Sequence, residues 1–566
     1  MDRKLWVVSI LGVLTVAIVL LCIQPAASGQ NPETKAEEGV VAGTGTLSGT
    51  VKAPKAFTAA RVYAKNVDKN VVYMVYTNQG QFRAINLLPG NYEVNVVKNG
   101  FKSTDAQKIT VAPGVNASAD FSLNESQVMP IQGKRPGIPK GLPLVSYDTL
   151  YPAAEARESI ERTCMHCHGP DFIPSHQWDD SQWNAAINLM SDTTATIPGR
   201  ILPGTFTTKQ RQDLVDYLVK NFGPDSTPRG LEVPDMPVDE QILSKAMYVE
   251  YHLPPLPNNK RRGLHDSHFD NNGNVWYTDR SGLYIGRVDP RTGSFKDYPI
   301  PDPIALPHGI TMDHDGQHMW WAGNTVLTKL DTATGEMTLH PVGVQDTAHQ
   351  SHGHTPVMDA KDNVWFTASY TDEIGQFDQH TDKLTMFKVP TAYSFPYALV
   401  MDAGGKLWMA EWSRCKAVKF DPELKQFTEY SPLTRPCTMR RLSVDHKGIV
   451  WYALGNAKIG KLDPNTGKII EYTLPVKFAY PYDIQPDAQD NMWISDSGQG
   501  GALVKFDQGT EKFTYYPSPQ MTDMPKLEIT REGAIWYTTR AADAKEQAVG
   551  VLYPDMSKIK TMAAYY

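Results

Sequence analysis

A tryptophan that follows an apolar residue recurs at a nearly constant interval through the C-terminal half of this chain. The seven positions are Trp276, Trp320, Trp365, Trp408, Trp451, Trp493 and Trp536, spaced by 44, 45, 43, 43, 42 and 43 residues. An aspartate stands six residues before most of them and seven before Trp320, and Thr530 takes its place before Trp536. Each unit has room for four short strands separated by turns. Seven such units predict a seven-bladed β-propeller over residues 247–566.

A propeller must close its ring, and two segments of this sequence are candidates for the closing strand. Residues 247–254, Met-Tyr-Val-Glu-Tyr-His-Leu-Pro, have the composition of an outer strand, whereas residues 561–566 end the chain. The sequence leaves both alternatives open.

Residues 46–125 predict a small β-sandwich ahead of the propeller. Short alternating runs such as 71–76 and 92–97 are separated by turn residues. The stretch that begins at Gly80, Gly-Gln-Phe-Arg-Ala-Ile-Asn-Leu-Leu-Pro-Gly-Asn-Tyr-Glu-Val, resembles carboxypeptidase regulatory-like domains. The resemblance implies an accessory module without chemistry of its own. A linker rich in Pro and Gly is expected over residues 126–150.

The most specific chemical motif is Cys164-Met-His-Cys167-His168, which has the C-x-x-C-H spacing of a c-type haem attachment site. The two thiols are one helical turn apart and can both bond the porphyrin edge, and His168 is placed to ligate the iron. A zinc half-site would want a second ligand pair nearby, and a redox disulfide would want a βαβ context. Neither is found, so haem c is the predicted cofactor.

The sequence around this motif, residues 151–223, resembles a small monohaem cytochrome c domain. Residues 155–162 have helical composition, and residues 214–223 look like the closing helix of such domains. The expected fold class is therefore multidomain and mainly β: an N-terminal β-sandwich, a small α-helical cytochrome c domain and a C-terminal seven-bladed β-propeller.

The second axial ligand of the haem iron is predicted to be Met190. Trp183, Ile187 and Met190 stand at i, i+4 and i+7, on one face of a helix, and no other methionine lies between the motif and the closing helix. Thioether ligation favours electron transfer. His176 is the alternative ligand, an open sixth position is another, and Met190 as a core residue is the structural interpretation.

Composition and the N-terminus indicate an exported protein. A net charge of −7 argues against a nucleic-acid partner, which would want a basic face. Arg3 and Lys4 precede an apolar run over residues 5–23, and small residues follow, so residues 1–28 predict a signal peptide or an uncleaved membrane anchor. The expected location is periplasmic, with membrane contact only through that segment.

The individual propeller units, such as Asn274-Val-Trp-Tyr-Thr-Asp, resemble the repeats of virginiamycin B lyase. Members of that family are magnesium-dependent carbon–oxygen eliminases. They have a Glu-Pro-His segment before the tryptophan and a glutamate three residues after it. Here the segments end in Gly-Leu-His265, Leu-Pro-His308 and His352-Gly-His354, without that first glutamate. The resemblance therefore implies the fold more than the lyase activity.

The start of each innermost strand places one residue per blade at the channel mouth. These residues are His265, His308, His354, Tyr397, Arg440, Tyr482 and Pro525, with Lys526 beside the last. Three histidines on consecutive blades, with Asp279 and Glu411 three residues after their tryptophans, suit a second metal such as copper, iron or zinc. His268 and His352 are expected to support them. The alternative is that these histidines only hydrogen-bond water or backbone.

Two further roles are expected at this mouth. Arg440 and Lys526 are predicted to hold an anionic substrate or developing negative charge. Cys415 and Cys437 fall on the same face of adjacent blades, and a disulfide between them would pin the loop that carries Arg440. Two buried thiols are the alternative.

The expected function is electron transfer by an exported c-type cytochrome. In its sharper form it is an oxidoreductase whose channel residues His265, His308, His354 and Arg440 act on a small substrate, while the haem passes electrons to a redox partner protein. Two alternatives remain: a carbon–oxygen lyase related to virginiamycin B lyase, and a non-catalytic protein that docks its haem onto a partner.

Overall fold

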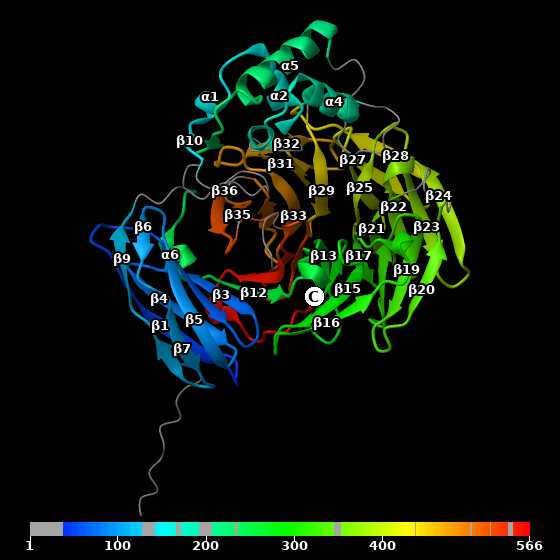
Figure 1. The fold of residues 1–566 in the computed structure, drawn as a ribbon. Helices are drawn as coiled ribbons and strands as arrows, with labels where there is room; N and C mark the ends of the chain where they lie inside the picture. The colour runs from blue at the N-terminus through cyan, green and yellow to red at the C-terminus, as the bar shows by residue number, and fades with distance from the viewer. Residues whose placement is uncertain are drawn as a thin grey trace, which may run out of the picture. The chain divides into compact units, whose positions relative to one another are not determined.

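All seven repeat tryptophans lie on the second strand of a four-stranded antiparallel unit in the computed structural model (Figure 1). The structure describes residues 38–126, 142–165, 170, 172–191, 206–232, 236–343, 352–435, 437–498, 501–520, 522–540 and 547–566. Glu38–Tyr566 form one compact unit. The periodic units predicted from the sequence are therefore propeller-like blades.

The first four blades follow one another along the chain. They are β13 to β16 (Leu264–Phe269, Val275–Asp279, Tyr284–Asp289, Ser294–Pro299), β17 to β20 (Ile310–Met312, His318–Ala322, Val326–Asp331, Met337–Pro341), β21 to β24 (Gly353–Met358, Asn363–Ala368, Glu373–Asp378, Lys383–Lys388) and β25 to β28 (Pro396–Met401, Leu407–Glu411, Lys416–Asp421, Gln426–Tyr430).

The last three blades complete the set. They are β29 to β32 (Met439–Val444, Val450–Leu454, Lys458–Leu462, Ile469–Thr473), β33 to β36 (Pro481–Pro486, Met492–Asp496, Ala502–Asp507, Lys512–Pro517), and β37 to β39 (Leu527–Ile529, Ile535–Thr538, Gln547–Tyr553) together with β12 (Met247–Leu253). Short 3₁₀ turns lie at Pro257–Asn259, Pro303–Ala305, Ser369–Thr371 and Met556–Lys558.

The ring is closed by β12, the first of the two candidate segments. It pairs antiparallel with β39, from Met247 opposite Tyr553 to Leu253 opposite Gln547. The innermost strands of consecutive blades contact one another around the ring, and β37 contacts β13. The last blade thus combines strands from both ends of the propeller sequence.

The aspartate before each tryptophan explains why the repeat is so regular. In five blades the buried indole N–H donates to a carboxylate oxygen of the aspartate six residues earlier. The pairs are Trp276–Asp270 (2.9 Å), Trp365–Asp359 (3.0 Å), Trp408–Asp402 (3.0 Å), Trp451–Asp445 (3.0 Å) and Trp493–Asp487 (3.2 Å). This bond gives a fully buried polar N–H its acceptor, and it ties the second strand to the preceding turn.

The N-terminal β domain consists of two sheets. One contains β1 (Gly45–Lys52), β4 (Gln81–Leu87), β6 (Phe101–Ser103), β8 (Asn116–Ser118) and β9 (Phe121–Glu125); the other contains β2 (Arg61–Asn66), β3 (Val71–Tyr76), β5 (Gly90–Val97) and β7 (Gln107–Val111).

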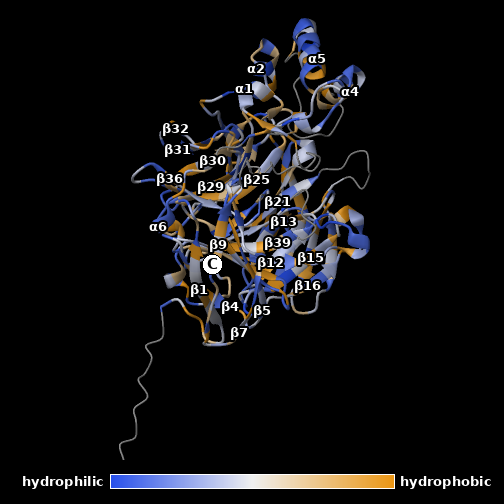
Figure 2. Cartoon of the chain, turned by 60° about the vertical axis from the view of Figure 1, so that its left-hand side comes forward, coloured by the Kyte–Doolittle hydropathy of each residue, from blue (hydrophilic) through white to orange (hydrophobic). Residues whose placement is uncertain are grey.

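The second of these sheets continues into the last propeller blade. Strand β3 pairs with β12, with Val75 opposite Met247 and Val71 opposite Tyr251. Hydrophobic residues of both strands join a single buried cluster, and Figure 2 shows hydrophobic colour where β12 and β39 meet. The N-terminal β domain is therefore joined to the propeller by an uninterrupted sheet of eight strands.

A small helical region stands between the two β parts in sequence. It contains β10 (Leu144–Val145), α1 (Tyr147–Leu150), α2 (Glu155–Arg162), a 3₁₀ turn (Ile173–Ser175), α4 (Asp180–Ser191), α5 (Thr208–Phe222) and β11 (Gly230–Leu231), and α6 (Glu240–Leu243) follows. Thr207 and Gln210 form a capping box at the start of α5. In the described part of the chain no helix is long and apolar enough to span a membrane, and residues 1–28 lie outside that part.

Candidate functional site

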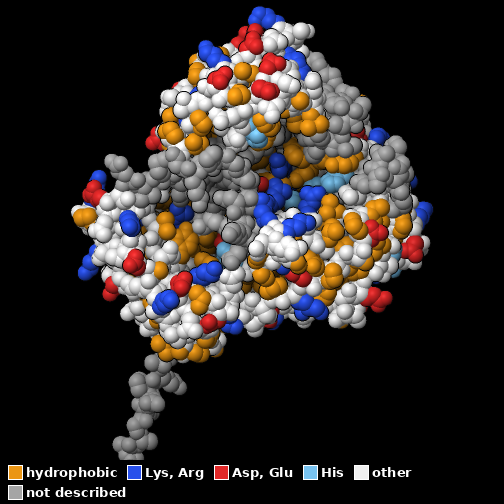
Figure 3. All heavy atoms as spheres, viewed as in Figure 1, with side chains coloured by type: hydrophobic (Ala, Val, Ile, Leu, Met, Phe, Trp, Pro, Cys, Tyr) orange, Lys and Arg blue, Asp and Glu red, His pale blue; other side chains and the backbone are white. Residues whose placement is uncertain are grey.

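Three histidines meet at the centre of the propeller, as the blade positions predict. The ring centroids of His265 and His308 are 3.9 Å apart, and those of His308 and His354 are 3.7 Å apart. All three side chains are buried, and we call them the histidine trio. Figure 3 shows histidine, lysine and arginine side chains gathered in the hollow in the middle of this face.

Threonines two residues after the repeat tryptophans hold these histidines in place. Each hydroxyl donates to the backbone carbonyl of a channel residue on the next blade. The pairs are Thr538 with His265, Thr278 with His308 (3.0 Å) and Thr367 with Tyr397 (2.9 Å). This link between blades fixes the spacing of the innermost strands, and it was not anticipated from the sequence.

The trio is uncharged and keeps unused nitrogen atoms. Burial lowers the pKa of His265 to about 3 and lowers the pKa values of His308 and His354 far below the usual range. Nδ1 of His265 lies 2.8 Å from a carboxylate oxygen of Asp266, and Nδ1 of His354 lies 2.8 Å from the Thr355 hydroxyl. Nε2 of His265, Nδ1 of His308 and Nε2 of His354 are buried without a hydrogen-bond partner. Such atoms are available to a ligand.

An aromatic pair continues the row beyond His354. The Tyr397 ring packs on His354 at 3.6 Å between centroids, and its hydroxyl lies 2.7 Å from that of Tyr482. The Arg440 guanidinium lies 4.4 Å from the ring centroids of both Tyr482 and Trp412. Although burial raises the pKa of Tyr482, the nearby arginines, Arg440 foremost, bring it below its usual value. Arg440 therefore packs on the aromatic residues next to the trio, at Tyr482 and Trp412.

Further arginines make the mouth strongly cationic. Arg540 lies 5.8 Å from the Tyr482 ring and pairs with Asp523 at 2.9 Å. Burial, followed by repulsion from Arg540, lowers the pKa of Arg280. Arg441 donates to Asp266 at 2.7 Å, so this cation is balanced by a carboxylate. Sequence reasoning missed Arg280 and Arg540, although each stands four residues after a repeat tryptophan, a position that could have been inspected.

Lys526 and His268 are both engaged by Glu528, whereas His352 lies close to the trio. Lys526 pairs with Glu528 at 2.5 Å, so its charge is already satisfied. His268 lies 3.3 Å from the same Glu528. His352 remains beside the trio, with its ring 5.9 Å from that of His308, and it stacks on Tyr370 at 4.5 Å.

The acidic residues three positions after Trp276 and Trp408 are Asp279 and Glu411, and neither is hydrogen-bonded to the trio. Asp279 accepts from Arg262 at 3.1 Å and from the Gly263 backbone at 2.8 Å. Glu411 is buried with neither carboxyl oxygen hydrogen-bonded, and burial, followed by repulsion from Glu429, raises its pKa to about 8. The two acids predicted beside the histidines, Asp279 and Glu411, are therefore not brought together around the trio.

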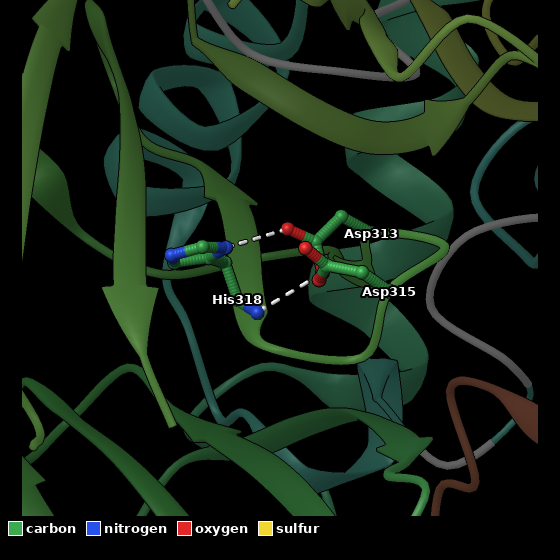
Figure 4. Close-up of side chains that lie close together, drawn as sticks. All are labelled: Asp313, Asp315 and His318. Carbon is green, nitrogen blue, oxygen red and sulfur yellow. Dashed lines mark hydrogen bonds and ion pairs between the residues drawn. The ribbon is translucent and has the colours of Figure 1, made fainter. Parts of the chain in front are cut away.

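Only one group of histidine and acidic side chains in the described residues brings its potential metal-ligand atoms within 4.8 Å of one another. It is Asp313, Asp315 and His318, in the turn between β17 and β18 (Figure 4). The trio does not form such a group as it stands. A second metal at His265, His308 and His354 stays a prediction.

The Asp313 group has a structural explanation. The turn of this blade carries one extra residue, and a carboxylate oxygen of Asp313 lies 2.7 Å from Nδ1 of His318, while its other oxygen accepts from the His318 backbone at 3.0 Å (Figure 4). The Trp320 N–H is left without a partner. His318 thus takes the place that the indole occupies in other blades.

The haem motif lies partly within the described residues. Cys164 follows α2 as a free, partly buried cysteine, and burial raises the pKa of its thiol. Met165 is buried, and its sulfur lies 3.4 Å from the Tyr147 hydroxyl, which donates to Glu161 at 2.7 Å. Cys167 and His168 lie outside the described residues.

The two candidates for the second axial ligand differ in their surroundings. Trp183 and Ile187 are buried on α4, and Met190 on the same helix is partly buried. His176 is held locally, with Nδ1 2.6 Å from the Phe172 carbonyl and its ring 4.1 Å from that of Trp178.

The helical region touches the propeller next to this motif. The Phe478 ring lies 4.5 Å from that of Tyr147, and the Lys477 ammonium lies 4.6 Å from the same ring. Phe478 belongs to the segment that enters β33, the strand that carries Tyr482.

The predicted disulfide between Cys415 and Cys437 is confirmed, with 5.7 Å between the Cα atoms. Cys437 stands two residues before β29, which carries Arg440. The bond therefore anchors the entry to this innermost strand from the neighbouring blade.

Comparisons with known proteins agree with the two β parts. Residues 324–549 match the virginiamycin B lyase family, and residues 46–124 match the carboxypeptidase regulatory-like domain. The chain therefore contains a virginiamycin B lyase-like β-propeller and an N-terminal carboxypeptidase regulatory-like domain. The helical region lies outside both matches. No curated protein matches the sequence.

Solved structures of lyases are also similar to this chain. A streptogramin B lyase structure is 20% identical with a TM-score of 0.48, over 54% of this chain and 97% of that one. Virginiamycin B lyase from Staphylococcus aureus is 18% identical with a TM-score of 0.48, over 54% of this chain and 99% of that one.

Proposed function

We propose that this protein is an exported oxidoreductase that binds a small anionic substrate at the propeller mouth. Electrons would leave through a c-type haem attached at Cys164 and Cys167 and ligated by His168. The channel residues and the C-x-x-C-H motif support the two halves of this proposal. A redox partner protein would receive the electrons.

The substrate class follows from the charges at the mouth. Arg280 and Arg440 supply positive charge, whereas Arg540 is paired with Asp523, and the histidine trio supplies neutral nitrogen atoms without partners. An anion beside the trio would favour the protonated form of its imidazoles. The histidines would then take up protons released by substrate oxidation, while Arg440 holds the negative charge.

The described residues of the helical region fit a covalently attached porphyrin. Cys164 offers a free thiol that packs against the buried cluster of this region. The Trp183 indole N–H is buried there without an acceptor, which suits an anionic or carbonyl group of a bound cofactor. The haem, when bound, supplies one-electron chemistry. Met190 is proposed as the second axial ligand, because no other methionine lies between the motif and α5. His176, whose Nδ1 lies 2.6 Å from the Phe172 carbonyl, is the alternative.

One observation carries the proposal that the two sites work together. The short segment before β33 places Phe478 on Tyr147, whose hydroxyl reaches Met165 inside the haem motif. Four residues further on, the same stretch of chain places Tyr482 in the channel cluster. The substrate site and the cofactor motif are thus linked by a few consecutive residues, which favours electron transfer within one chain.

The first test is a visible spectrum and an elemental analysis of protein expressed in a host competent in cytochrome maturation. We expect one covalently bound haem iron per chain, and loss of the haem in Cys164→Ala and Cys167→Ala. His308→Ala should keep the haem band and lose any second metal. Colourless protein with both thiols open to alkylation would overturn the cytochrome assignment.

A carbon–oxygen lyase is the second candidate, favoured by the match of residues 324–549 to the virginiamycin B lyase family. Under this proposal the neutral carboxyl of Glu411 would serve as a general acid, since its pKa is raised to about 8. Incubation with a streptogramin B and magnesium distinguishes the two candidates. Ring opening by a preparation without haem would support the lyase, whereas substrate-dependent reduction of the haem would support the oxidoreductase.

A further inference from the structure

The last blade lacks the bond that holds the tryptophan in five others. Thr530 stands where those blades have aspartate, and the Trp536 N–H has no hydrogen-bond partner. Trp536 is only 1% exposed, so an unsatisfied donor is buried here. Such a group costs free energy unless a ligand or water satisfies it.

Thr530 replaces only half of the missing carboxylate. Its hydroxyl accepts from the Ala534 backbone at 3.0 Å, as one oxygen of Asp270 accepts from Asn274 at 2.9 Å in the first blade. The other oxygen of Asp270 binds the Trp276 indole at 2.9 Å, and threonine has no counterpart to it. The turn is preserved, and a single acceptor oxygen is absent.

A cavity of about 240 Å³ opens at this position, lined by both Thr530 and Trp536. In the five blades that keep this bond the indole N–H faces the side chain six residues earlier, so by the same repeat geometry the Trp536 N–H faces Thr530, which lines the cavity. Four basic side chains also line it: Lys505, Arg531, Lys558 and Lys560.

The acids in the cavity wall are largely engaged by their own surroundings. Asp487 accepts from the Trp493 indole at 3.2 Å and from the Asn491 side chain at 3.0 Å. Asp555 accepts from the Ser557 backbone at 3.1 Å and lies 3.9 Å from the Lys558 ammonium. Glu532 is the third acid in the wall, so four basic side chains face three acids, of which Asp487 and Asp555 are engaged.

We propose that this cavity binds a small carboxylate, with one carboxylate oxygen accepting from the Trp536 N–H in place of the missing aspartate. The surrounding lysines would hold the remaining negative charge. The site lies beside the turns that precede the repeat tryptophans, apart from the strand starts that carry the histidine trio. It is independent of the proposed function at the mouth.

The second blade provides a matched control. Trp320 also lacks an acceptor for its N–H, but its indole stacks on His340 at 5.4 Å between ring centroids. Trp320→Phe removes a buried indole N–H without touching the proposed site. Trp536→Phe removes the donor at the site and keeps an aromatic ring there.

The experiment is calorimetric titration of the full-length protein with succinate, acetate and inorganic phosphate. We expect saturable binding of succinate and weaker binding of acetate by the wild type and by Trp320→Phe. Affinity should fall at least about tenfold in Trp536→Phe, because a hydrogen bond to a charged group is lost. Thr530→Asp supplies the missing carboxylate from the chain, so it should abolish binding and raise the Tm.

The outcomes separate the interpretations. Absence of saturable binding with succinate and acetate, or equal affinity in wild type and Trp536→Phe, would overturn the proposal. Saturable phosphate binding without carboxylate binding would overturn the ligand class. If Thr530→Asp does not fold, Trp536→Phe against Trp320→Phe still decides the matter.

Discussion

At the scale of single residues, the histidine trio is held neutral by burial. The unfolded chain binds protons at these histidines near pH 6.5, whereas His265 in the folded protein titrates only near pH 3. Between these values the unfolded state binds more protons, so the free energy of unfolding falls as the pH falls.

We expect acid to destabilise this propeller more steeply than its surface charges alone would. Each histidine of the trio contributes about 1.4 kcal/mol per pH unit below pH 6.5. His308→Gln should reduce the slope of unfolding free energy against pH between pH 4 and pH 6. Denaturant unfolding at several pH values measures it, with exposed His446→Gln as the control. An unchanged slope in His308→Gln would show that His308 is not buried neutral.

Glu411 behaves in the opposite sense, because burial raises the pKa of its carboxyl to about 8. The unfolded state releases this proton near pH 4.5, so the native state loses stability as the pH rises from there toward 8. Glu411→Gln keeps the shape and removes the titration. Its unfolding free energy should exceed that of the wild type by a margin that grows by more than 1 kcal/mol from pH 5 to pH 8. A margin that is constant with pH would contradict a neutral Glu411.

At the scale of elements, the sequence predicted most where a pattern repeats. The tryptophan period placed every second strand. His265, His308 and His354 stand eleven, twelve and eleven residues before their tryptophans, and this similar offset placed three side chains together. Prediction failed where a partner comes from an unrelated part of the chain. The sequence predicts that Lys526 and His268 are available at the channel mouth, but both pair with Glu528, and no period in the sequence identifies that contact.

Closure of the ring could not be decided for a similar reason. An outer strand needs only alternating apolar residues, and the β12 sequence does not reveal that it pairs with β39 on one edge and β3 on the other. Strand pairing is a property of two segments, so one segment alone does not specify it.

The disulfide is an element-scale feature with a measurable effect. It closes a separation of 22 residues between Cys415 and Cys437 and ties the entry to β29 to the preceding blade. Cys415→Ser with Cys437→Ser should lower the unfolding free energy by about 2–4 kcal/mol. Reduction of the wild type should give the same loss, and reduction of the double variant should give none. A double variant as stable as the oxidised wild type would show that the bond only caps a preformed loop.

At the scale of the whole molecule, the N-terminal β domain completes the propeller. Strand β12 lies between β39 and β3, so a chain that begins after β9 would expose an apolar edge strand. We expect that shortened chain to associate or precipitate at concentrations where the full chain stays dispersed, as light scattering would show. A dispersed shortened chain with an unchanged Tm would mean that the eight-stranded sheet adds nothing to stability.

The contact between Phe478 and Tyr147 is where electrons would pass from the proposed channel site to the proposed haem site. Tunnelling between redox groups weakens steeply as they separate, so Phe478→Ala should slow haem reduction by a channel-bound donor. Haem content, the visible spectrum and reduction by dithionite should stay at wild-type values, because the variant leaves the residues of the C-x-x-C-H motif unchanged. Tyr472→Phe, on an outer strand, is the control. If the haem of Phe478→Ala is reduced at the wild-type rate when substrate is oxidised in the channel, electrons do not cross at this contact. The helical region must then serve a donor outside the chain.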